Sequence, residues 1–314
     1  MRFASDLILA LAGPTGSGKS TLSLALARYL RGLGQETEII CCDSITVYRG
    51  FDIGSAKPSR EERGAFPHHL LDIRDAEENF TAAEFAREAD AAIAGIRERG
   101  ALPLLVGGTG FYLRALLQGM TEESPEETEQ AAELKASLAA RADSEGLESL
   151  YREMIALDPH LQIHPNDRYR IIRSLQVMRA TGKKWSELNQ EARAREPRYR
   201  NVRLFWIDLD REELRGRIEA RTEEMIHRGL LEEVRGHLIR GVPPDAKPLQ
   251  SVGYKEALAH LQESGDRNTD RLRSEIVQGT MRLAKAQRTW FRGEPLAERL
   301  DQATLETLLR QLEP

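Results

Sequence analysis

Cysteine is scarce in this chain. Cys41 and Cys42 are the only two cysteines among 314 residues, and they are adjacent. Neighbouring residues on a strand point to opposite faces, so these two thiols cannot easily form a disulfide. The composition is typical of a reduced protein, and we expect a cytoplasmic location. We interpret both cysteines as buried strand residues, with a reactive thiol as the alternative.

Long hydrophobic runs are also missing. No apolar run approaches the roughly 20 residues that a membrane helix needs. The apolar stretch near the N-terminus continues into a glycine-rich loop rather than a cleavage site, so we expect no signal peptide and no membrane partner. Hydrophobic residues make up 40% of the chain and charged residues 30%, which is typical of a folded globular protein. The length is sufficient for two domains.

Acidic residues outnumber basic ones, and the net charge of −5 argues weakly against a nucleic-acid partner. The distribution of charge indicates the opposite. Residues 165–203 hold eleven Lys or Arg against four acids, and residues 271–293 hold six against one. Aromatic residues, including Tyr169, Tyr199 and Trp290, are interspersed among these bases. Bases can contact phosphates and aromatic rings can stack on unpaired nucleobases, although a solvated protein surface remains the alternative.

Short apolar runs alternate with helical patterns along most of the chain. This alternation predicts an α/β fold in which a P-loop NTPase-like parallel sheet is flanked by helices. The expected strands cover residues 6–12, 38–42, 102–106 and 202–209, and the expected helices cover 20–33, 80–99, 109–117 and 211–238. Residues 119–200 contain no strand-like run. We therefore predict a core domain of residues 1–118 and 201–314, with basic C-terminal helices, and a helical insertion domain of residues 119–200.

A phosphate-binding loop follows the first expected strand. Residues 13–20, GPTGSGKS, match the pattern G-x-x-x-x-G-K-[ST] between a strand and a helix. The glycines let successive amide hydrogens face inward, and the helix N-terminus adds to the attraction for an anion. Lys19 supplies a cation, and Ser20 supplies a hydroxyl ligand for Mg²⁺. The loop predicts a diphosphate or triphosphate ligand without identifying it.

The magnesium aspartate of nucleotide hydrolases has no counterpart after the third expected strand, which ends in two glycines and Thr109. Asp43 is the acid at a strand end near the loop, whereas Asp208 lies far along the chain. Asp43 is well placed to accept a proton from a nucleophile. A turn or helix-capping aspartate is the alternative interpretation.

Several separated motifs together resemble the tRNA dimethylallyltransferases, also called tRNA isopentenyltransferases. They span nearly the whole chain: GPTGSGKS at 13–20, IGSAKP at 53–58, PHHLLDI at 67–73, LLVGGTGFYLRAL at 104–116, HPNDRYRIIRSLQV at 164–177, SVGYKEAL at 251–258 and RLAKAQRTWFR at 282–292. The resemblance implies transfer of a dimethylallyl group from dimethylallyl diphosphate to the N6 amine of the adenosine directly 3′ of the anticodon in tRNA. Diphosphate is the leaving group.

The same resemblance assigns roles to individual residues. Asp43 corresponds to the general base, Thr109 helps to position the substrates, and Lys19 with a Mg²⁺ ion on Ser20 stabilises the departing diphosphate. The predicted diphosphate site comprises Gly13, Thr15, Gly16, Ser17, Gly18, Lys19, Ser20, Arg217 and Arg221. Arg217 and Arg221 lie four residues apart on one helix face, and ion pairs with Glu213 or Glu224 are their alternative.

The resemblance also predicts a binding surface for the anticodon stem-loop of tRNA. It comprises Asp43, Ser44, Ile45, Thr46, Thr109, Asn166, Asp167, Arg168, Tyr169, Arg170, Gln250, Ser251, Val252, Gly253, Tyr254, Lys255, Arg282, Lys285 and Arg288. Thr46 and Ala286 depart from the Gln and Arg that many family members carry. His68 and His69 are interpreted as structural or substrate-lining residues rather than zinc ligands. We expect a monomer.

Three other functions compete with this one. A small-molecule kinase of the shikimate or nucleoside type would use the same loop for ATP and Asp43 as the base, but it does not require the basic aromatic tail. A P-loop switch or assembly ATPase would need carboxylates that bind magnesium and position water, which the sequence does not reveal. An isopentenyltransferase that acts on free adenylate shares the chemistry, and the basic segments favour tRNA over a free nucleotide.

Overall fold

The computed structural model describes residues 4–119, 129–194, 197–263 and 269–312. The chain forms two compact units, one of residues 1–116 with 199–314 and the other of residues 117–198. These boundaries each lie two residues from the predicted ones. The units are described separately below as the core unit and the insertion unit.

The core unit is built on a six-stranded sheet with the order β3-β2-β4-β1-β5-β6. All five strand pairs are parallel. The strands are β1 (Ile8–Ala12), β2 (Thr37–Cys42), β3 (His68–His69), β4 (Leu102–Gly107), β5 (Val202–Ile207) and β6 (Ala297–Leu300). β1 lies between β4 and β5, where the strand order reverses, and ligands of open α/β sheets bind at the carboxyl end of such a position.

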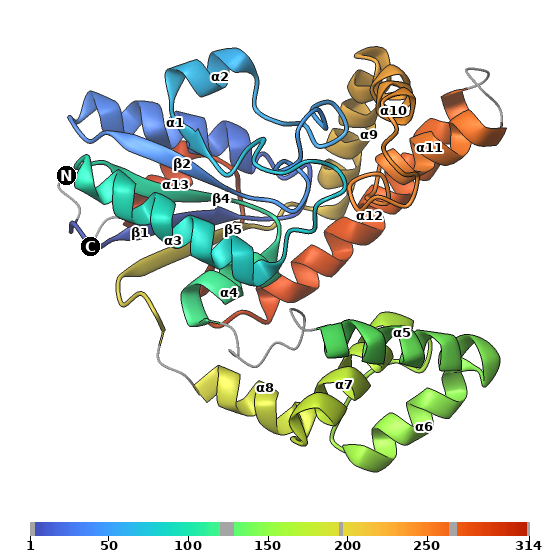
Figure 1. The fold of residues 1–314 in the computed structure, drawn as a ribbon. Helices are drawn as coiled ribbons and strands as arrows, with labels where there is room; N and C mark the ends of the chain where they lie inside the picture. Colours follow the sequence, from blue (N-terminus) through green and yellow to red (C-terminus); the bar gives the residue numbers. More distant parts are fainter. Residues whose placement is uncertain (1–3, 120–128, 195–196, 264–268, 313–314) are drawn as a thin grey trace. The chain divides into compact units, whose positions relative to one another are not determined.

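Helices cover both faces of this sheet (Figure 1). They are α1 (Lys19–Gly32), α2 (Arg60–Ala65), α3 (Ala82–Glu98), α4 (Gly110–Gln118), α9 (Arg211–His227), α10 (Leu230–Ile239), α11 (Tyr254–Glu263), α12 (Thr269–Arg292) and α13 (Leu305–Leu312). The predicted fold class is therefore confirmed.

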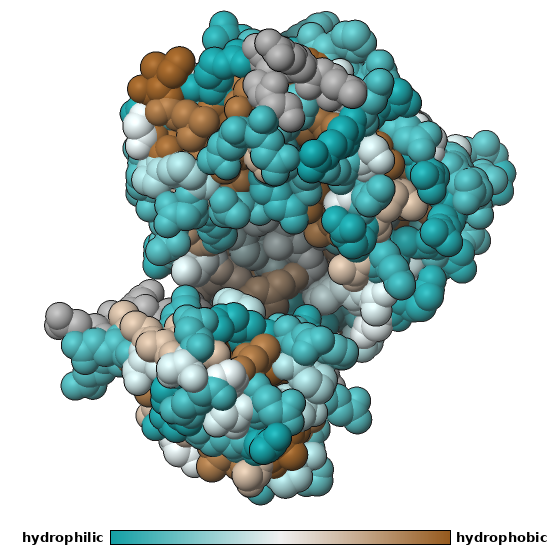
Figure 2. Space-filling model, turned by 90° about the vertical axis from the view of Figure 1, so that its right-hand side faces the viewer, coloured by the Kyte–Doolittle hydropathy of each residue, from teal (hydrophilic) through white to brown (hydrophobic). Residues whose placement is uncertain are grey.

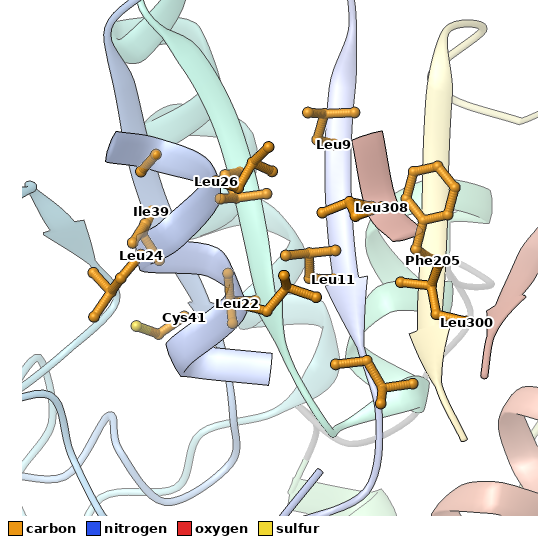
Figure 3. Packing of buried hydrophobic residues seen from close by; sticks show 14 of the residues in the cluster. Leu9, Leu11, Leu22, Leu24, Leu26, Ile39, Cys41, Phe205, Leu300 and Leu308 are labelled. Carbon is orange, nitrogen blue, oxygen red and sulfur yellow. The ribbon is translucent and has the colours of Figure 1, made fainter. Parts of the chain in front are cut away.

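A hydrophobic core joins α1 to one face of the sheet. Figure 3 shows Leu22, Leu24 and Leu26 of α1 in one cluster with Leu11 of β1 and Cys41 of β2. Cys41 and Cys42 are both buried free thiols, as predicted. Burial raises the pKa of Cys41 to about 12 and also raises that of Cys42, so both thiols stay protonated at neutral pH.

The prediction of one helix over residues 211–238 was wrong, because two helices occupy this stretch. α9 ends at His227, and α10 begins after Gly229, whose φ of 96° is left-handed. Glycine adopts that conformation at little cost, so the chain changes direction there. The apolar pattern continues through the break because both helices bury apolar residues.

The insertion unit consists of α5 (Glu129–Ser144), α6 (Leu147–Leu157), α7 (Arg168–Thr181) and α8 (Trp185–Ala194). Its own hydrophobic core includes Leu138, Leu150, Met154 and Leu175. No helix in the described parts of either unit is long and apolar enough to cross a membrane. The face shown in Figure 2 is mostly hydrophilic, with hydrophobic residues in separate patches.

Candidate active site

A pocket of about 530 Å³ lies at the carboxyl ends of the central strands, entirely within the core unit. Short segments that are distant in sequence meet there. They include the P-loop and the start of α1, the turn after β2, the turn after β4, the middle of α9, the segment that precedes α11, and one face of α12. The predicted site residues in its lining are Thr15, Lys19, Ser20, Asp43, Ser44, Ile45, Thr46, Thr109, Arg221, Gln250, Ser251, Val252, Gly253 and Tyr254.

The P-loop joins β1 to α1 and forms one end of this pocket. Its backbone closes on itself, since the Ser17 amide donates to the Pro14 carbonyl at 3.2 Å. The Lys19 ammonium lies 3.4 Å from the same carbonyl oxygen. Burial, with the Arg221 guanidinium as the second cause, lowers the pKa of Lys19 to about 8. A cation held in such surroundings is stabilised when an anion binds beside it.

Asp43 follows β2 and faces this cation-rich end. Its Oδ1 accepts hydrogen bonds from the amides of Ile45 at 2.8 Å and Thr46 at 3.2 Å. Asp43 is therefore a turn aspartate through Oδ1, whereas its role as the base stays a prediction. Among the described residues, Oδ2 has no hydrogen-bond partner, so this oxygen can accept a proton from a bound group.

Thr109 lies in the turn between β4 and α4. Its amide donates to the Cys42 carbonyl at 3.3 Å, which places the turn directly beside the end of β2 and therefore beside Asp43. Gly108 precedes it, and a Cβ at this position would lie 3.0 Å from the Gly13 carbonyl and 2.5 Å from the Gln287 side chain. Only glycine fits, because the P-loop and α12 both approach the backbone here.

The two arginines of α9 have different surroundings. Arg221 lines the pocket, and its Nη2 lies 3.4 Å from the Ser55 carbonyl oxygen. Arg217 lies outside the pocket lining, where it forms the predicted alternative ion pair with Glu213 at 2.8 Å and donates to the Ser17 carbonyl at 3.2 Å. Arg217 therefore supports the P-loop from its outer side, whereas Arg221 faces the space where a ligand would bind.

A partly buried carboxylate supports the part of the wall around Gly54, and the sequence did not reveal it. Glu233 of α10 accepts hydrogen bonds from the amides of Asp52, Ile53 and Gly54, and from the Tyr254 hydroxyl at 2.5 Å. The side chain of Tyr254 is completely buried. Tyr254 therefore helps Glu233 to hold residues 52–54 beside the pocket, and its role in binding tRNA stays a prediction.

Helix α12 presents one face to the pocket through Ile276, Thr280, Leu283 and Gln287. Arg282 and Lys285 lie on exposed positions of the same helix, and neither pairs with another described residue. Arg288 is different, because its Nε donates to Asp208 at 2.5 Å. Asp208 has only 1% of its side chain exposed and also binds Arg299 at 3.0 Å. Arg288 therefore neutralises a buried acid, which leaves Arg282 and Lys285 for an external partner.

The predicted tRNA residues 166–170 belong to the insertion unit. Asp167 caps α7 by accepting from the Arg170 amide at 3.1 Å. Arg168 pairs with Asp143 at 2.9 Å, and Tyr169 between the two arginines has a relative exposure of 67%. An exposed aromatic ring of this kind suits stacking against an unpaired nucleobase.

Comparison with known proteins identifies the family. The family described as IPP transferase matches residues 46–294. The tRNA dimethylallyltransferase 1 of Trichlorobacter lovleyi is 49% identical over 92% of this chain and 91% of the relative. The tRNA dimethylallyltransferase of Geobacter metallireducens is 46% identical over 89% of this chain and 87% of its own. The chain belongs to the IPP transferase family.

Solved structures of similar proteins agree with this IPP transferase assignment. The full-length tRNA isopentenylpyrophosphate transferase from Bacillus halodurans is 32% identical, with a TM-score of 0.68 over 98% of this chain and 94% of that one. A eukaryotic dimethylallyltransferase, described as acting on tRNA, is 27% identical, with a TM-score of 0.74 over 95% of this chain and 74% of that one. The predicted family resemblance is thus confirmed.

The two histidines of this IPP transferase have separate roles. His68 lines the pocket, and its Nδ1 lies 2.8 Å from the Phe66 carbonyl. His69 instead lies 2.7 Å from Glu38, which also binds Arg99. Among the described residues no group of three His, Cys, Asp or Glu could hold a metal ion. This arrangement agrees with the interpretation of the histidines as structural or lining residues.

Proposed function

We propose that this enzyme transfers the dimethylallyl group of dimethylallyl diphosphate to the N6 amine of the adenosine directly 3′ of a tRNA anticodon. The observation that carries the proposal is the shared pocket. In a member of the IPP transferase family, a phosphate-binding loop and a carboxylate at the end of β2 line one cavity. One group can bind the leaving diphosphate while the other accepts the proton of the nucleophile.

The donor diphosphate binds in the P-loop in this proposal. The bond between the allylic carbon and the diphosphate oxygen breaks, and charge accumulates on the oxygen that leaves. Lys19 and Arg221 line this end of the pocket together with the loop, and both can stabilise that charge. Preorganised cations and amides in a partly dry site are usually the largest single contribution to catalysis.

The acceptor amine loses a proton as its bond to carbon forms. An aryl amine is a weak nucleophile, because its lone pair is delocalised into the ring. Asp43 Oδ2 accepts the proton, while Oδ1 keeps the carboxylate fixed on the turn. General-base assistance of this kind is typically worth roughly 10²–10⁴-fold in rate. Thr109, which is held beside the end of β2, positions the reactants in this scheme.

A magnesium ion fits this site only together with its ligand. The exposed Ser20 hydroxyl lines the pocket, whereas Asp208 is fully engaged by arginines. Ser20 would therefore be a protein ligand, with diphosphate and water oxygens completing the octahedral shell that Mg²⁺ prefers. Bound there, the ion would neutralise charge on the diphosphate.

We propose RNA contacts in each unit by itself. In the core unit they include the exposed basic side chains of α12, and in the insertion unit they include residues 166–170. The target base must leave its stack to enter a pocket, which costs a few kcal/mol and less in an unpaired loop. The turn from Asp43 to Thr46 and the segment from Gln250 to Gly253 line the pocket and would contact the flipped nucleotide. Lys255, which is exposed, would contact the backbone.

A transfer assay tests the proposal. The protein would be mixed with Mg²⁺, radiolabelled dimethylallyl diphosphate and an anticodon stem-loop with adenosine next to the anticodon. Parallel reactions would supply AMP as the acceptor or ATP as the donor. We expect label in the RNA and none in AMP. Label mainly in AMP would indicate an enzyme for free adenylate, and ATP consumption without prenyl transfer would contradict the proposal.

A further inference from the structure

Gln287 connects two loops that bind or flank the phosphate site. Its Oε1 accepts a hydrogen bond from the Thr15 amide of the P-loop at 3.0 Å. Its Nε2 donates to the Gly108 carbonyl in the turn after β4, also at 3.0 Å. One side-chain amide thus joins the carboxyl ends of β1 and β4 from a helix that follows both in the chain.

Close packing and an ion pair hold the backbone around Gln287 in place. The turn has a glycine at 108, where any Cβ would meet the Gln287 amide at 2.5 Å. The next residue, Arg288, fixes α12 to the buried Asp208 at the end of β5. Three residues after Gln287, Trp290 packs against Gly110 at the start of α4, where an added Cβ would lie 2.2 Å from the indole ring. The helix is therefore held firmly where Gln287 meets the P-loop.

The bond to Thr15 also determines which amides remain for a ligand. Gln287 satisfies the Thr15 amide and the Pro14 carbonyl satisfies the Ser17 amide. The first turn of α1 follows directly, and the amides of a first helical turn have no partners within their own helix. Fixing the outer part of the loop leaves these inner amides aimed at the pocket, which is the arrangement that binds anions.

We propose that Gln287 is a positioning residue that holds the P-loop and the turn after β4 in the geometry that binds diphosphate. It acts by holding Thr15 and Gly108 in place and takes no part in the chemistry of the transfer. The inference rests on the proposed function for the identity of the ligand, but it concerns the affinity for diphosphate rather than the transfer reaction.

Three variants test this role. Gln287→Ala removes both hydrogen bonds. Gln287→Glu keeps the size of the side chain and the acceptor for Thr15, but it places a carboxylate oxygen against the Gly108 carbonyl. Gln278→Ala is the matched control, because Gln278 is exposed on the same helix and bonds only Ser274 within it, at 3.4 Å. Calorimetry would measure the affinity for inorganic diphosphate with Mg²⁺, and steady-state kinetics would separate the KM values of the two substrates.

We expect Gln287→Ala and Gln287→Glu to weaken diphosphate binding about tenfold, since two hydrogen bonds are lost or disturbed. The KM for dimethylallyl diphosphate should rise similarly, while the KM for the stem-loop stays within about twofold of the control. Diphosphate affinity equal to that of Gln278→Ala would overturn the inference, as would a selective loss of RNA affinity. If Gln287→Ala does not fold, the nearly isosteric Gln287→Glu decides the question. Failure of the wild type to transfer the prenyl group would reject the proposed function alone.

Discussion

In the proposed mechanism, Asp43 combines a structural and a chemical role in one side chain. Oδ1 is committed to the amides of Ile45 and Thr46, so the carboxylate cannot rotate freely. Oδ2 has no hydrogen-bond partner among the described residues, and Asp43 lines the pocket. Substitution of Asp43 by alanine would remove both roles at once. Substitution by asparagine would keep the hydrogen bonds of the turn and remove only the base.

Asp43→Asn should therefore reduce turnover by roughly 10²–10⁴-fold while leaving the affinity for diphosphate within a few-fold of the wild type. The asparagine Oδ1 can still accept from both amides, but its amide group cannot take a proton. Single-turnover transfer measurements and diphosphate calorimetry would provide the two values. Turnover within a few-fold of the wild type would show that another group is the base.

Lys19 gives the site a dependence on pH. Its pKa is lowered to about 8 in the free protein, and a bound diphosphate raises it again. Above pH 8 binding must then take up a proton, so the affinity for dimethylallyl diphosphate should fall by up to about tenfold for each pH unit. Below pH 8 this contribution is constant.

The control for this pH dependence is Lys19→Arg, because a guanidinium stays charged throughout the range. The diphosphate itself titrates equally in both measurements, so its effect cancels when the Kd of the wild type is divided by the Kd of the variant at each pH. Between pH 8 and 9.5 we expect the Kd of the wild type to rise relative to that of the variant. A constant ratio would mean that Lys19 does not titrate in this range.

Local motifs reveal some site residues and conceal others. Lys19 and Ser20 could be predicted because the P-loop pattern is continuous and its mechanism depends on spacing. Gln287 could not, since its partner Thr15 lies 272 positions away. Glu233 was missed for the same reason, because it binds the backbone of residues 52–54, and a backbone partner leaves no signature in side-chain identity.

At the scale of elements, the side chains of helix α12 have three different surroundings. One face lines the pocket, Arg288 anchors the helix to Asp208, and the exposed Arg282 and Lys285 face solvent. The sequence predicted a basic segment but could not separate these bases. Only the fold shows which arginine is compensated by a buried acid.

Replacing Arg282 and Lys285 together with Gln should weaken binding of the stem-loop and lower its salt slope by up to about two, roughly one for each lost phosphate contact. Arg271→Gln with Arg273→Gln is the matched control on the same helix. Those arginines already pair with Glu275 and Glu223, at 2.8 and 3.1 Å. An equal loss of slope in both double variants would show that only net charge matters.

Asp208→Asn should lower the free energy of unfolding by about 2–3 kcal/mol, because charged hydrogen bonds to a buried group are lost. Chemical denaturation would measure this change. Glu298→Gln on the neighbouring β6 is the control, since its pair with Arg203 is partly exposed and should contribute less than about 1 kcal/mol. Equal effects would mean that Asp208 is not a structural anchor.

Element boundaries show where reasoning from patterns fails. The long amphipathic stretch after residue 211 was predicted as one helix because both α9 and α10 bury apolar residues at helical spacing. The left-handed Gly229 between them decides the break. β3 and β6 were not predicted, because they have only two and four residues and lie at the edges of the sheet.

At the scale of the whole molecule, the alternation of strands and helices was sufficient to predict the parallel sheet and the helical insertion. The strand order was not predictable from it. Placing β1 between β4 and β5 brings Asp43, Thr109 and Arg221 to one pocket from three separate segments. The family resemblance could indicate that these residues work together, but only the topology provides the reason.

The most direct test of the central claim is the chemical identity of the product. Stem-loops carrying either adenosine or purine riboside directly 3′ of the anticodon would be incubated with the enzyme, dimethylallyl diphosphate and Mg²⁺. Nucleoside digestion and mass spectrometry would follow. We predict N6-dimethylallyl-adenosine from the first RNA and no prenylated nucleoside from the second, which has no amine at this position. Prenylation of the second RNA, or of another nucleoside in the first, would contradict the assignment of the acceptor.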